Sequence, residues 1–500
     1  MEIDELLVDL KENSQIECKL SQDKFPKEAL YTYSAFANTD GGVILLGIEE
    51  TKTGFNIVGL KNIEKIKREL FDSLNNTEKV NKNIISNKNV YEKEIDGKKI
   101  LIVNIPKASY KEKPIFTGRN PLIGTYKRNY EGDYRCSEME VKAMMRDSSD
   151  ESMDNTLLEG FTIEDLDEKT LVDYRKRFAN LKPQHPFVGM EDEEFLRKIG
   201  VLRKNRSNGN IEVTMAGILI FGKTEAIKEV LPHFFMEYID KSNSLEERWS
   251  DRIIYDGTWG EGNIYNFFFL VINKLYSSVK KSFNLEKDGI TRKELNSTQI
   301  ALREAFVNSI IHSDFRIEEA IKITRYPNYY EFKNPGTLRI SKSDFFRGEH
   351  SKPRNNIMND IFKHINLCEQ AGSGVPKILS AVKEEKFKYP EIEEKNMIFI
   401  LKFWNINKIT DYDKATLEEK NILHYLLKHY QITNKEAREN FNYSKKKVNS
   451  LFESLIEKEY IERVGLGRGT FYKLKLSEDE EKIKLLENIN ETFRKIKQNI

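Results

Sequence analysis

Apolar residues along the chain fall into runs whose length and spacing differ from segment to segment. Residues 41–50, GGVILLGIEE, and residues 98–107, KKILIVNIPK, are short runs rich in branched apolar side chains, as is typical of buried strands. Asp40 and the two glycines that follow it give a turn signal before the first run. These patterns predict that residues 1–148 form a compact α/β unit.

The segment after this unit is polar and contains few apolar residues. Residues 146–160, RDSSDESMDNTLLEG, are typical of a linker, and short amphipathic helical patterns follow them. The run EVTMAGILIFGK at residues 212–223 has the pattern of a buried strand. We therefore expect a linker and helical connector over residues 149–230 and a further domain over residues 231–410.

One apolar segment within this further domain carries polar residues at a regular spacing. In ALREAFVNSIIHSDF, residues 301–315, Glu304, Asn308 and His312 recur at every fourth position. If the segment is a helix, these three side chains form one line along it, roughly opposite apolar residues such as Phe306.

The last part of the chain has a different pattern of apolar and polar residues. Residues 411–476 contain three short helical patterns followed by YIERVGLGRGTFYKLKL, which is typical of two strands around a Gly-Arg-Gly turn. Residues 477–500 predict a charged amphipathic helix, which would serve either as a packing or dimer arm or as a plain solvated helix.

Composition narrows the class of protein. A chain of 500 residues suggests about three to four domains, and a net charge of +1 means that any nucleic-acid surface must be a local patch. The three cysteines are far apart and form no CxxC pair, which fits a reducing compartment and no structural zinc. No signal-peptide layout or membrane-spanning run is present, so we expect a cytoplasmic protein with no membrane partner.

The line of polar residues on the helix suggests a site for ATP with magnesium. Such a site needs oxygen ligands for the ion, backbone N–H groups facing the phosphates and, for hydrolysis, a carboxylate that activates water. Glu304 would be the base and Asn308 the magnesium ligand. Seven further residues are candidates for cofactor binding. They are His312 on the same line, Asn334 and Gly336 after a strand pattern, Lys352 and Arg354 in HSKPRNN, and Gly372 and Gly374 in AGSGVPKIL.

The ordered set REAFVNSIIHSDF, FKNPG, KPRN and AGSGVPKI resembles the divergent ATPase module of the gyrase, histidine-kinase and mismatch-repair (GHKL) superfamily, the Bergerat fold. The resemblance covers about seventy residues, and it implies that Glu304 is the catalytic base and Asn308 the magnesium ligand. The chain departs from the family pattern where Asn334 stands in place of the Asp that binds adenine, and only Gly336 follows it. A purely structural role for Glu304 and Asn308 stays open.

The sequence also matches a second phosphate-binding motif. Residues 217–224, GILIFGKT, match GxxxxGK[ST]. A phosphate-binding loop must expose its N–H groups, whereas four consecutive large apolar residues indicate a buried strand. We therefore expect no such loop here.

The N-terminal unit carries a second resemblance. KENSQIECKL, YSAFANTDGGVILLGIEE and IGTYKRNYEGDYRCSEMEVKAMMRD resemble the Schlafen AlbA-type domain, over about 140 residues. The resemblance implies nucleic-acid binding and, in some relatives, an RNase centre of two Glu and one Asp. A metal-dependent nuclease needs about three acidic ligands. The candidates here are Glu12, Glu17 and either Glu49 or Glu50, with Glu12 and Glu17 as metal ligands.

Three outcomes stay open for this unit: cleavage, binding without cleavage, and a structural ion pair between Glu17 and Lys19. A basic and aromatic patch favours backbone contacts and base stacking. Its members are Arg119, Lys127, Arg128, Arg135, Tyr126, Tyr130 and Tyr134, and Lys19 is a further candidate for contact with nucleic acid.

Residues 431–474 resemble a winged helix-turn-helix, with a helix at about 444–458 poised for a major groove and GLGRGT as the wing. Lys445, Lys446 and Lys447, with Arg463 and Arg468, would contact phosphates, and Asn449 would read a base. A protein-binding winged helix is the alternative.

The patterns predict an α+β multidomain protein, and the resemblances imply an AlbA-type domain, a Bergerat-type sandwich and a winged helix. We expect a transcriptional regulator that binds ATP and magnesium and whose binding to DNA or RNA depends on nucleotide, acting as a homo-oligomer and with partner proteins. The alternatives are an anti-phage or stress effector with an N-terminal nuclease, and a scaffold with a vestigial nucleotide site.

Overall fold

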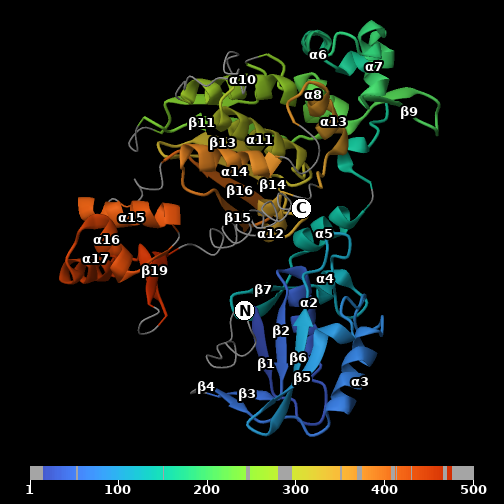
Figure 1. Ribbon diagram of the computed structural model, residues 1–500. Helices are drawn as coiled ribbons and strands as arrows, with labels where there is room; N and C mark the ends of the chain where they lie inside the picture. Colours follow the sequence, from blue (N-terminus) through green and yellow to red (C-terminus); the bar gives the residue numbers. More distant parts are fainter. Residues whose placement is uncertain are drawn as a thin grey trace. The chain divides into compact units, whose positions relative to one another are not determined.

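The computed structural model describes residues 15–51, 54–149, 151–243, 248–258, 260–279, 295–348, 352–368, 374–406, 412, 414–429, 431–465 and 470–475. Contacts divide the chain into two units (Figure 1). Unit 1 holds the N-terminal residues to Ser152 together with Arg339–Ser341, and unit 2 holds the rest.

Unit 1 is built on a four-stranded sheet in the order β1-β2-β6-β5. Its strands are β1 (Ile16–Lys19), β2 (Gly42–Leu46), β5 (Val90–Ile95) and β6 (Lys98–Ile105), and only the β1–β2 pair is parallel. Helices α2 (Ala29–Asn38) and α3 (Ile63–Leu74) supply apolar side chains to the core beside this sheet. The strands predicted at residues 41–50 and 98–107 are confirmed.

Smaller elements complete unit 1. Two hairpins, β3 (Ile48–Thr51) with β4 (Gly54–Ile57) and β7 (Tyr126–Asn129) with β8 (Gly132–Arg135), carry most of the charged residues considered below. Helices α4 (Pro121–Gly124) and α5 (Glu138–Ser148) follow, and α5 starts with a capping box between Ser137 and Glu140.

Unit 2 begins with short helices and one hairpin. These are α6 (Glu168–Leu181), α7 (Asp192–Lys198), β9 (Leu202–Lys204), β10 (Ile211–Val213), α8 (Met215–Phe221) and α9 (Thr224–Val230). The prediction of a strand at GILIFGK was wrong, because this run is the helix α8, capped by Thr214 and buried on all sides. A short, wholly apolar run has no period that separates a buried strand from a buried helix.

The centre of unit 2 is a six-stranded sheet in the order β12-β11-β13-β14-β16-β15. Its strands are β11 (Met236–Asp240), β12 (Asp251–Ile254), β13 (Ile321–Arg325), β14 (Tyr329–Pro335), β15 (Glu391–Lys395) and β16 (Ile398–Trp404). Apolar residues of one face, such as Ile323, Phe332 and Leu401, belong to the main core. Helices α10 (Ile264–Ser278), α11 (Ser297–Ile311) and α14 (Gly374–Glu385) pack on the sheet to form a two-layer arrangement (Figure 1).

The other face of this sheet is polar. Glu237 on β11 forms ion pairs with Lys322 on β13, at 3.0 Å, and with Arg252 on β12, at 2.5 Å. Alternation along the strands therefore separates an apolar face under the helices from a charged face.

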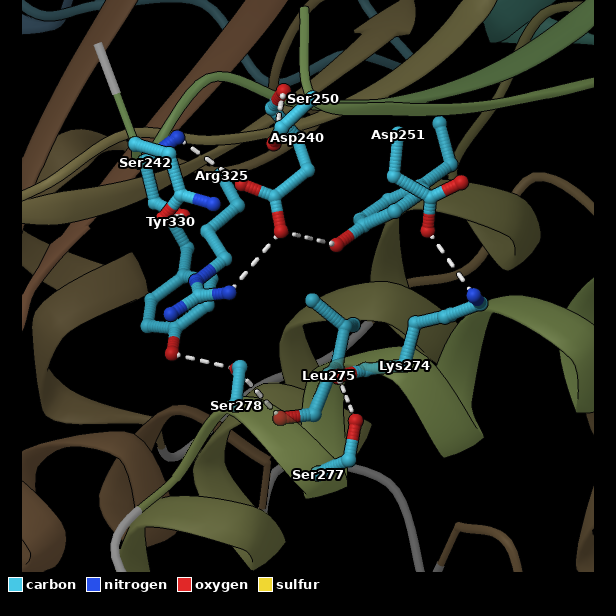
Figure 2. A network of polar contacts seen from close by, with 12 residues as sticks. Asp240, Ser242, Ser250, Asp251, Lys274, Leu275, Ser277, Ser278, Arg325 and Tyr330 are labelled. Carbon is cyan, nitrogen blue, oxygen red and sulfur yellow. Dashed lines mark hydrogen bonds and ion pairs between the residues drawn. The ribbon is translucent and has the colours of Figure 1, made fainter.

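Polar contacts join the ends of β11 and β13 to each other, and they join β12 and β14 to α10 (Figure 2). Asp240 Oδ2 lies 2.9 Å from Arg325 Nη1, and Asp240 Oδ1 accepts the backbone N–H of Ser242 at 2.8 Å. Burial alone would raise the pKa of Asp240, but the hydrogen bonds from Ser242 and the charge of Arg325 outweigh it and lower that pKa. Tyr330 on β14 lies 2.7 Å from the hydroxyl of Ser278 at the end of α10.

The remaining elements include α12 (Lys342–Arg347) and α13 (Asn356–His364). A separate small core unites α15 (Leu417–His429), α16 (Asn434–Phe441) and α17 (Lys445–Glu457) with a three-stranded sheet in the order β17-β19-β18. These strands are β17 (Gln431–Ile432), β18 (Ile461–Val464) and β19 (Phe471–Leu474). The helix predicted over residues 477–500 lies outside the described residues.

Candidate functional site

Helix α11 carries the polar line that the sequence singles out. Asn296 caps its start in a reciprocal pair with Gln299, and His312 is its C-cap. Apolar side chains surround the helix because the sheet, α10 and α14 all pack around it. The line from Glu304 to His312 therefore lies on a helix that is largely buried.

Glu304 is almost fully buried, with 2% of its surface exposed. Its Oε1 lies 2.9 Å from the ammonium of Lys377 on α14 and 3.4 Å from Arg303 Nη2. A buried carboxylate requires such partners because an isolated charge loses its hydration. Burial, with the negative charge of Glu304 nearby, raises the pKa of Cys368 to about 12, so this thiol stays protonated.

Gly374, the first residue of α14, lies directly against the pair of polar residues on α11. A Cβ added to Gly374 would lie 3.1 Å from Asn308 Nδ2 and 3.3 Å from Glu304 Oε2. Only a residue without a side chain lets the backbone of α14 approach this closely. The structure therefore brings together three of the predicted residues, and it adds Lys377 to them.

Asn308 is half-buried, and within the described part of the chain its carboxamide has no hydrogen-bond partner. The start of a helix presents backbone N–H groups and partial positive charge. An uncommitted carboxamide oxygen beside a bare helix start is a donor set that fits a magnesium-bound phosphate group.

A clasp formed by Arg354 and Asn355 holds the C-terminal end of α11. Both backbone N–H groups donate to the Ile311 carbonyl, at 3.1 and 3.0 Å. The side chain of Asn355 donates to the carbonyls of Ile310 and Ser313, at 3.2 and 2.9 Å. These contacts satisfy carbonyls that have no partner within the helix.

Arg354 is buried in this clasp and does not extend toward solvent. Its Nη1 donates to the His312 carbonyl at 2.8 Å, and its Nη2 donates to the Thr337 carbonyl at 2.6 Å. The guanidinium also packs on Gly336, whose φ of +106° favours glycine. Arg354 therefore stabilises the C-terminal end of α11 through these carbonyls, contrary to the prediction that it contacts phosphate.

The remaining candidates are spread around this centre. Asn334 at the end of β14 is 2% exposed, and its amide donates to the Pro335 carbonyl at 3.2 Å, which leaves Oδ1 as the acceptor. Lys352 is exposed. Gly372 lies outside the described residues.

Sequence reasoning missed Lys377 and Asn355. Lys377 follows Gly374 by three residues, so the i, i+3 spacing on a helix could have placed it on the same face. Asn355 gives no such signal, because its partners are carbonyls more than forty residues away in the sequence.

GILIFGKT does not form a phosphate-binding loop. Residues Met215–Phe221 are helical, and Lys223 is the N-cap of α9, where its N–H donates to the Asp165 carbonyl. The structure therefore agrees with the prediction that this motif is not a phosphate-binding loop. The reason given for that prediction, a buried strand, was wrong.

In unit 1, Glu17 on β1 belongs to a buried ion-pair cluster. Arg128 Nη2 lies 2.8 Å from Glu17 Oε2, and Arg128 Nη1 lies 2.9 Å from Asp133 Oδ1. Lys19 pairs with the other oxygen of Glu17. The side chain of Arg128 is 1% exposed and that of Glu17 is 8% exposed. The expectation that Arg128 contacts nucleic acid is therefore contradicted, since its charge is used inside the domain.

The other carboxylates of the expected nuclease centre do not join this cluster. Glu49 is half-buried and Glu50 is exposed, on consecutive positions of β3 that point to opposite faces. Glu12 lies outside the described residues. Among the residues that the structure describes, no group of three His, Cys, Asp or Glu side chains could hold a metal ion.

The β7–β8 hairpin carries what remains of the basic and aromatic patch. Arg135 is exposed, as are Tyr130 and Tyr134, at 77% and 56%. Lys127 is paired with Glu140 and Arg119 with Glu78, so both charges are partly compensated. Tyr126 packs on Tyr31, with ring centroids 4.9 Å apart.

The small C-terminal module presents its basic residues at the start of α17. Lys445 and Lys446 are exposed, and Lys447 lies 2.6 Å from Glu418. Asn449 accepts a hydrogen bond from Asn434 at 2.6 Å, and Arg463 on β18 is exposed. Arg468, in the turn expected to form the wing, lies outside the described residues.

Comparison with protein-family models gives three matches. Residues 12–137 match the model described as "Schlafen, AlbA_2", and residues 318–403 match the model described as "Putative ATP-dependent DNA helicase recG C-terminal". Residues 142–237 match a model described as a domain of unknown function, DUF8451. No curated protein sequence matches the chain.

Solved structures that align with the chain include two proteins from bacteria. The DIP2311 protein from Corynebacterium diphtheriae is 17% identical, with 96% of this chain and 97% of that chain covered and a TM-score of 0.41. The N-terminal domain of a RecG-related protein from Nitrosomonas europaea is 28% identical, with 27% of this chain and 90% of that chain covered and a TM-score of 0.21. Separately, no helix among the described residues is long and apolar enough to cross a membrane.

Proposed function

Because the chain carries a Schlafen AlbA_2 domain and a domain of the recG C-terminal ATPase-like type, we propose that it is an ATP-binding transcriptional regulator whose affinity for nucleic acid depends on nucleotide. Its two roles belong to different parts of the chain. Nucleotide binding is assigned to α11 and α14, and nucleic-acid binding to the β7–β8 hairpin and to α17.

The observation that carries the proposal is the contact of Gly374 with Glu304 and Asn308. A helix start without a side chain, next to a carboxamide that has no partner among the described residues, would hold a phosphate through backbone N–H groups and magnesium through Asn308 Oδ1. Asn334 Oδ1 would accept the adenine amino group. Bound magnesium would neutralise phosphate charge.

We propose binding, and not rapid hydrolysis, as the primary activity of this site. A general base needs an oxygen within reach of the water whose proton it accepts. Glu304 Oε1 is already engaged by Lys377, and the carboxylate is buried. Glu304 would therefore chiefly hold α14 in place through Lys377, with Oε2 as the oxygen that these described contacts leave for water.

For nucleic acid, we propose a dual contact. Arg135 would bind phosphates while the exposed rings of Tyr130 and Tyr134 stack on bases. If the C-terminal module acts as a winged helix, Lys445 and Lys446 at the start of α17 would meet the backbone of duplex DNA. ATP would act by favouring one arrangement of a homo-oligomer.

Calorimetry of ATP with magnesium tests the nucleotide site. We expect Asn308→Ala to weaken binding at least about tenfold, which is a loss of roughly 1.4 kcal/mol. The matched control is Asn356→Ala, an exposed amide at the start of α13, which should leave the affinity unchanged. Equal affinity of Asn308→Ala and wild type would refute the site. A lack of any ATP-dependent thermal shift in wild type would favour the scaffold alternative.

A further inference from the structure

A groove in the connector region of unit 2 is lined mainly by cationic side chains. It has a volume of about 580 Å³ and lies between α7 and the β9–β10 hairpin. Its charged lining residues are Arg197, Lys198, Arg203, Lys204 and Arg206, with Glu194 as the single acid. The whole chain has a net charge of only +1, so this concentration of positive charge is local.

The charge in the groove is largely uncompensated. Arg203 contacts Asn155, a neutral partner, through both of its terminal nitrogens. The other four cations are exposed, and among the described residues none of them forms an ion pair. The remaining acids of α7 lie in its first turn, whereas Arg197 and Lys198 lie in its last turn.

The hairpin that carries three of these cations is held in a defined shape. The buried carboxylate of Glu212 accepts hydrogen bonds from the side chains of Asn205 and Asn208, both at 2.8 Å. Gly209 follows with a φ of +82°, a backbone conformation that closes the turn most readily with glycine. The turn that presents Arg206 is thus preorganised, which lowers the entropy lost on binding.

We propose that this groove binds the phosphodiester backbone of nucleic acid. Guanidinium groups match phosphate oxygens in a bidentate geometry, and five cations along one groove suit a row of phosphates better than a single small anion. Among the described residues that line the groove, none has an aromatic ring or a side-chain amide to read base edges. Binding is therefore independent of sequence, and it serves to position the chain on its target. The inference does not depend on the nucleotide site.

The test compares two triple variants of the full chain. Arg197→Gln, Lys204→Gln and Arg206→Gln remove charge from the groove, and Lys176→Gln, Lys228→Gln and Lys383→Gln remove the same charge from exposed positions elsewhere in unit 2. Binding is measured over a range of salt concentrations with 30-base-pair DNA, with single-stranded RNA and with inorganic phosphate. Thermal melting of both variants checks folding.

The groove variant should bind DNA at least tenfold more weakly than wild type. The slope of log K against log salt should fall in magnitude by about 2 to 3, since each lost phosphate contact removes about 0.9. Arg206→Lys should retain binding. An unchanged slope, an equal loss in the control variant, or saturation by inorganic phosphate as tight as by DNA would overturn the proposal. A stronger loss with RNA than with DNA would identify RNA as the source of the phosphates.

Discussion

Gly374 shows how a single missing side chain shapes the candidate site. Its neighbours across the helix interface are Asn308 Nδ2 and Glu304 Oε2, at 3.1 and 3.3 Å from the position of a Cβ. These distances are tighter than ordinary contacts, so a methyl group would displace the two polar side chains by a few tenths of an ångström. The pair on α11 and the start of α14 therefore act as one unit.

We expect Gly374→Ala to weaken binding of ATP with magnesium about tenfold or more while leaving the fold intact. An alanine is favourable within a helix, so its effect on stability through helix propensity is small and stabilising. The loss would come from displacement of Asn308. Calorimetry measures the affinity, and circular dichroism verifies the helix content. Wild-type affinity in this variant would show that the contact is not part of the nucleotide site.

Glu17 gives a different expectation at the residue scale. Glu17→Gln would leave the buried Arg128 with Asp133 as its remaining acidic partner, so it should destabilise unit 1 by up to about 3 kcal/mol. Hydrogen exchange of β1 and β7 measures this locally. Glu50→Gln, at an exposed position, is the control and should have little effect. If Glu17→Gln instead abolished metal-dependent RNA cleavage without loss of protection, the nuclease alternative would regain support.

For the helices and strands, the pattern of apolar and polar residues predicted some elements correctly and left others ambiguous. The α11 helix was predicted from polar residues at every fourth position, and the strands β2 and β6 were predicted from runs rich in branched apolar residues. The run in α8 was predicted wrongly, since the seven residues Met215–Phe221 are all buried and carry no period that distinguishes a helix from a strand. The clasp on α11 could not be predicted, because Asn355 binds carbonyls that only the tertiary fold brings near.

Helices α15 and α17 are linked by Glu419, and this link makes the C-terminal module sensitive to acid. Lys458 lies at the C-cap of α17 and donates to both oxygens of Glu419, at 2.8 Å. Burial acts to raise the pKa of Glu419, but the hydrogen bonds from Lys458, Ser454 and Thr416 outweigh it and lower the pKa to about 2.

We expect stability of this module to fall as the pH drops from about 4.5 to about 2. The folded pKa lies below the ordinary value of 4.5, so the folded state holds the carboxylate charged, and the stabilisation is complete above 4.5 and lost as the proton binds. Near-ultraviolet circular dichroism against pH measures the transition. Glu419→Gln should lower stability at neutral pH and flatten this part of the profile, whereas an unaltered profile would exclude Glu419 as its origin.

At the scale of the whole molecule, the proposal requires coupling between nucleotide and nucleic acid. If ATP with magnesium changes the affinity for DNA by some factor, DNA must change the affinity for ATP by the same factor, typically about 5 to 150. Anisotropy of labelled DNA with and without ATP, paired with calorimetry with and without DNA, measures both factors. We expect them to agree in wild type and to approach one in Asn308→Ala. Independent binding in wild type would remove the regulatory part of the proposal.

The clasp at the end of α11 restricts how such coupling could arise. Displacing this helix along its own axis would break the hydrogen bonds that residues 354 and 355 make to four successive carbonyls, Ile310 to Ser313. The position of Asn308 on α11 is therefore fixed. A rearrangement on nucleotide binding would therefore begin at α14, and it would have to break the ion pair between Glu304 and Lys377 that joins the two helices.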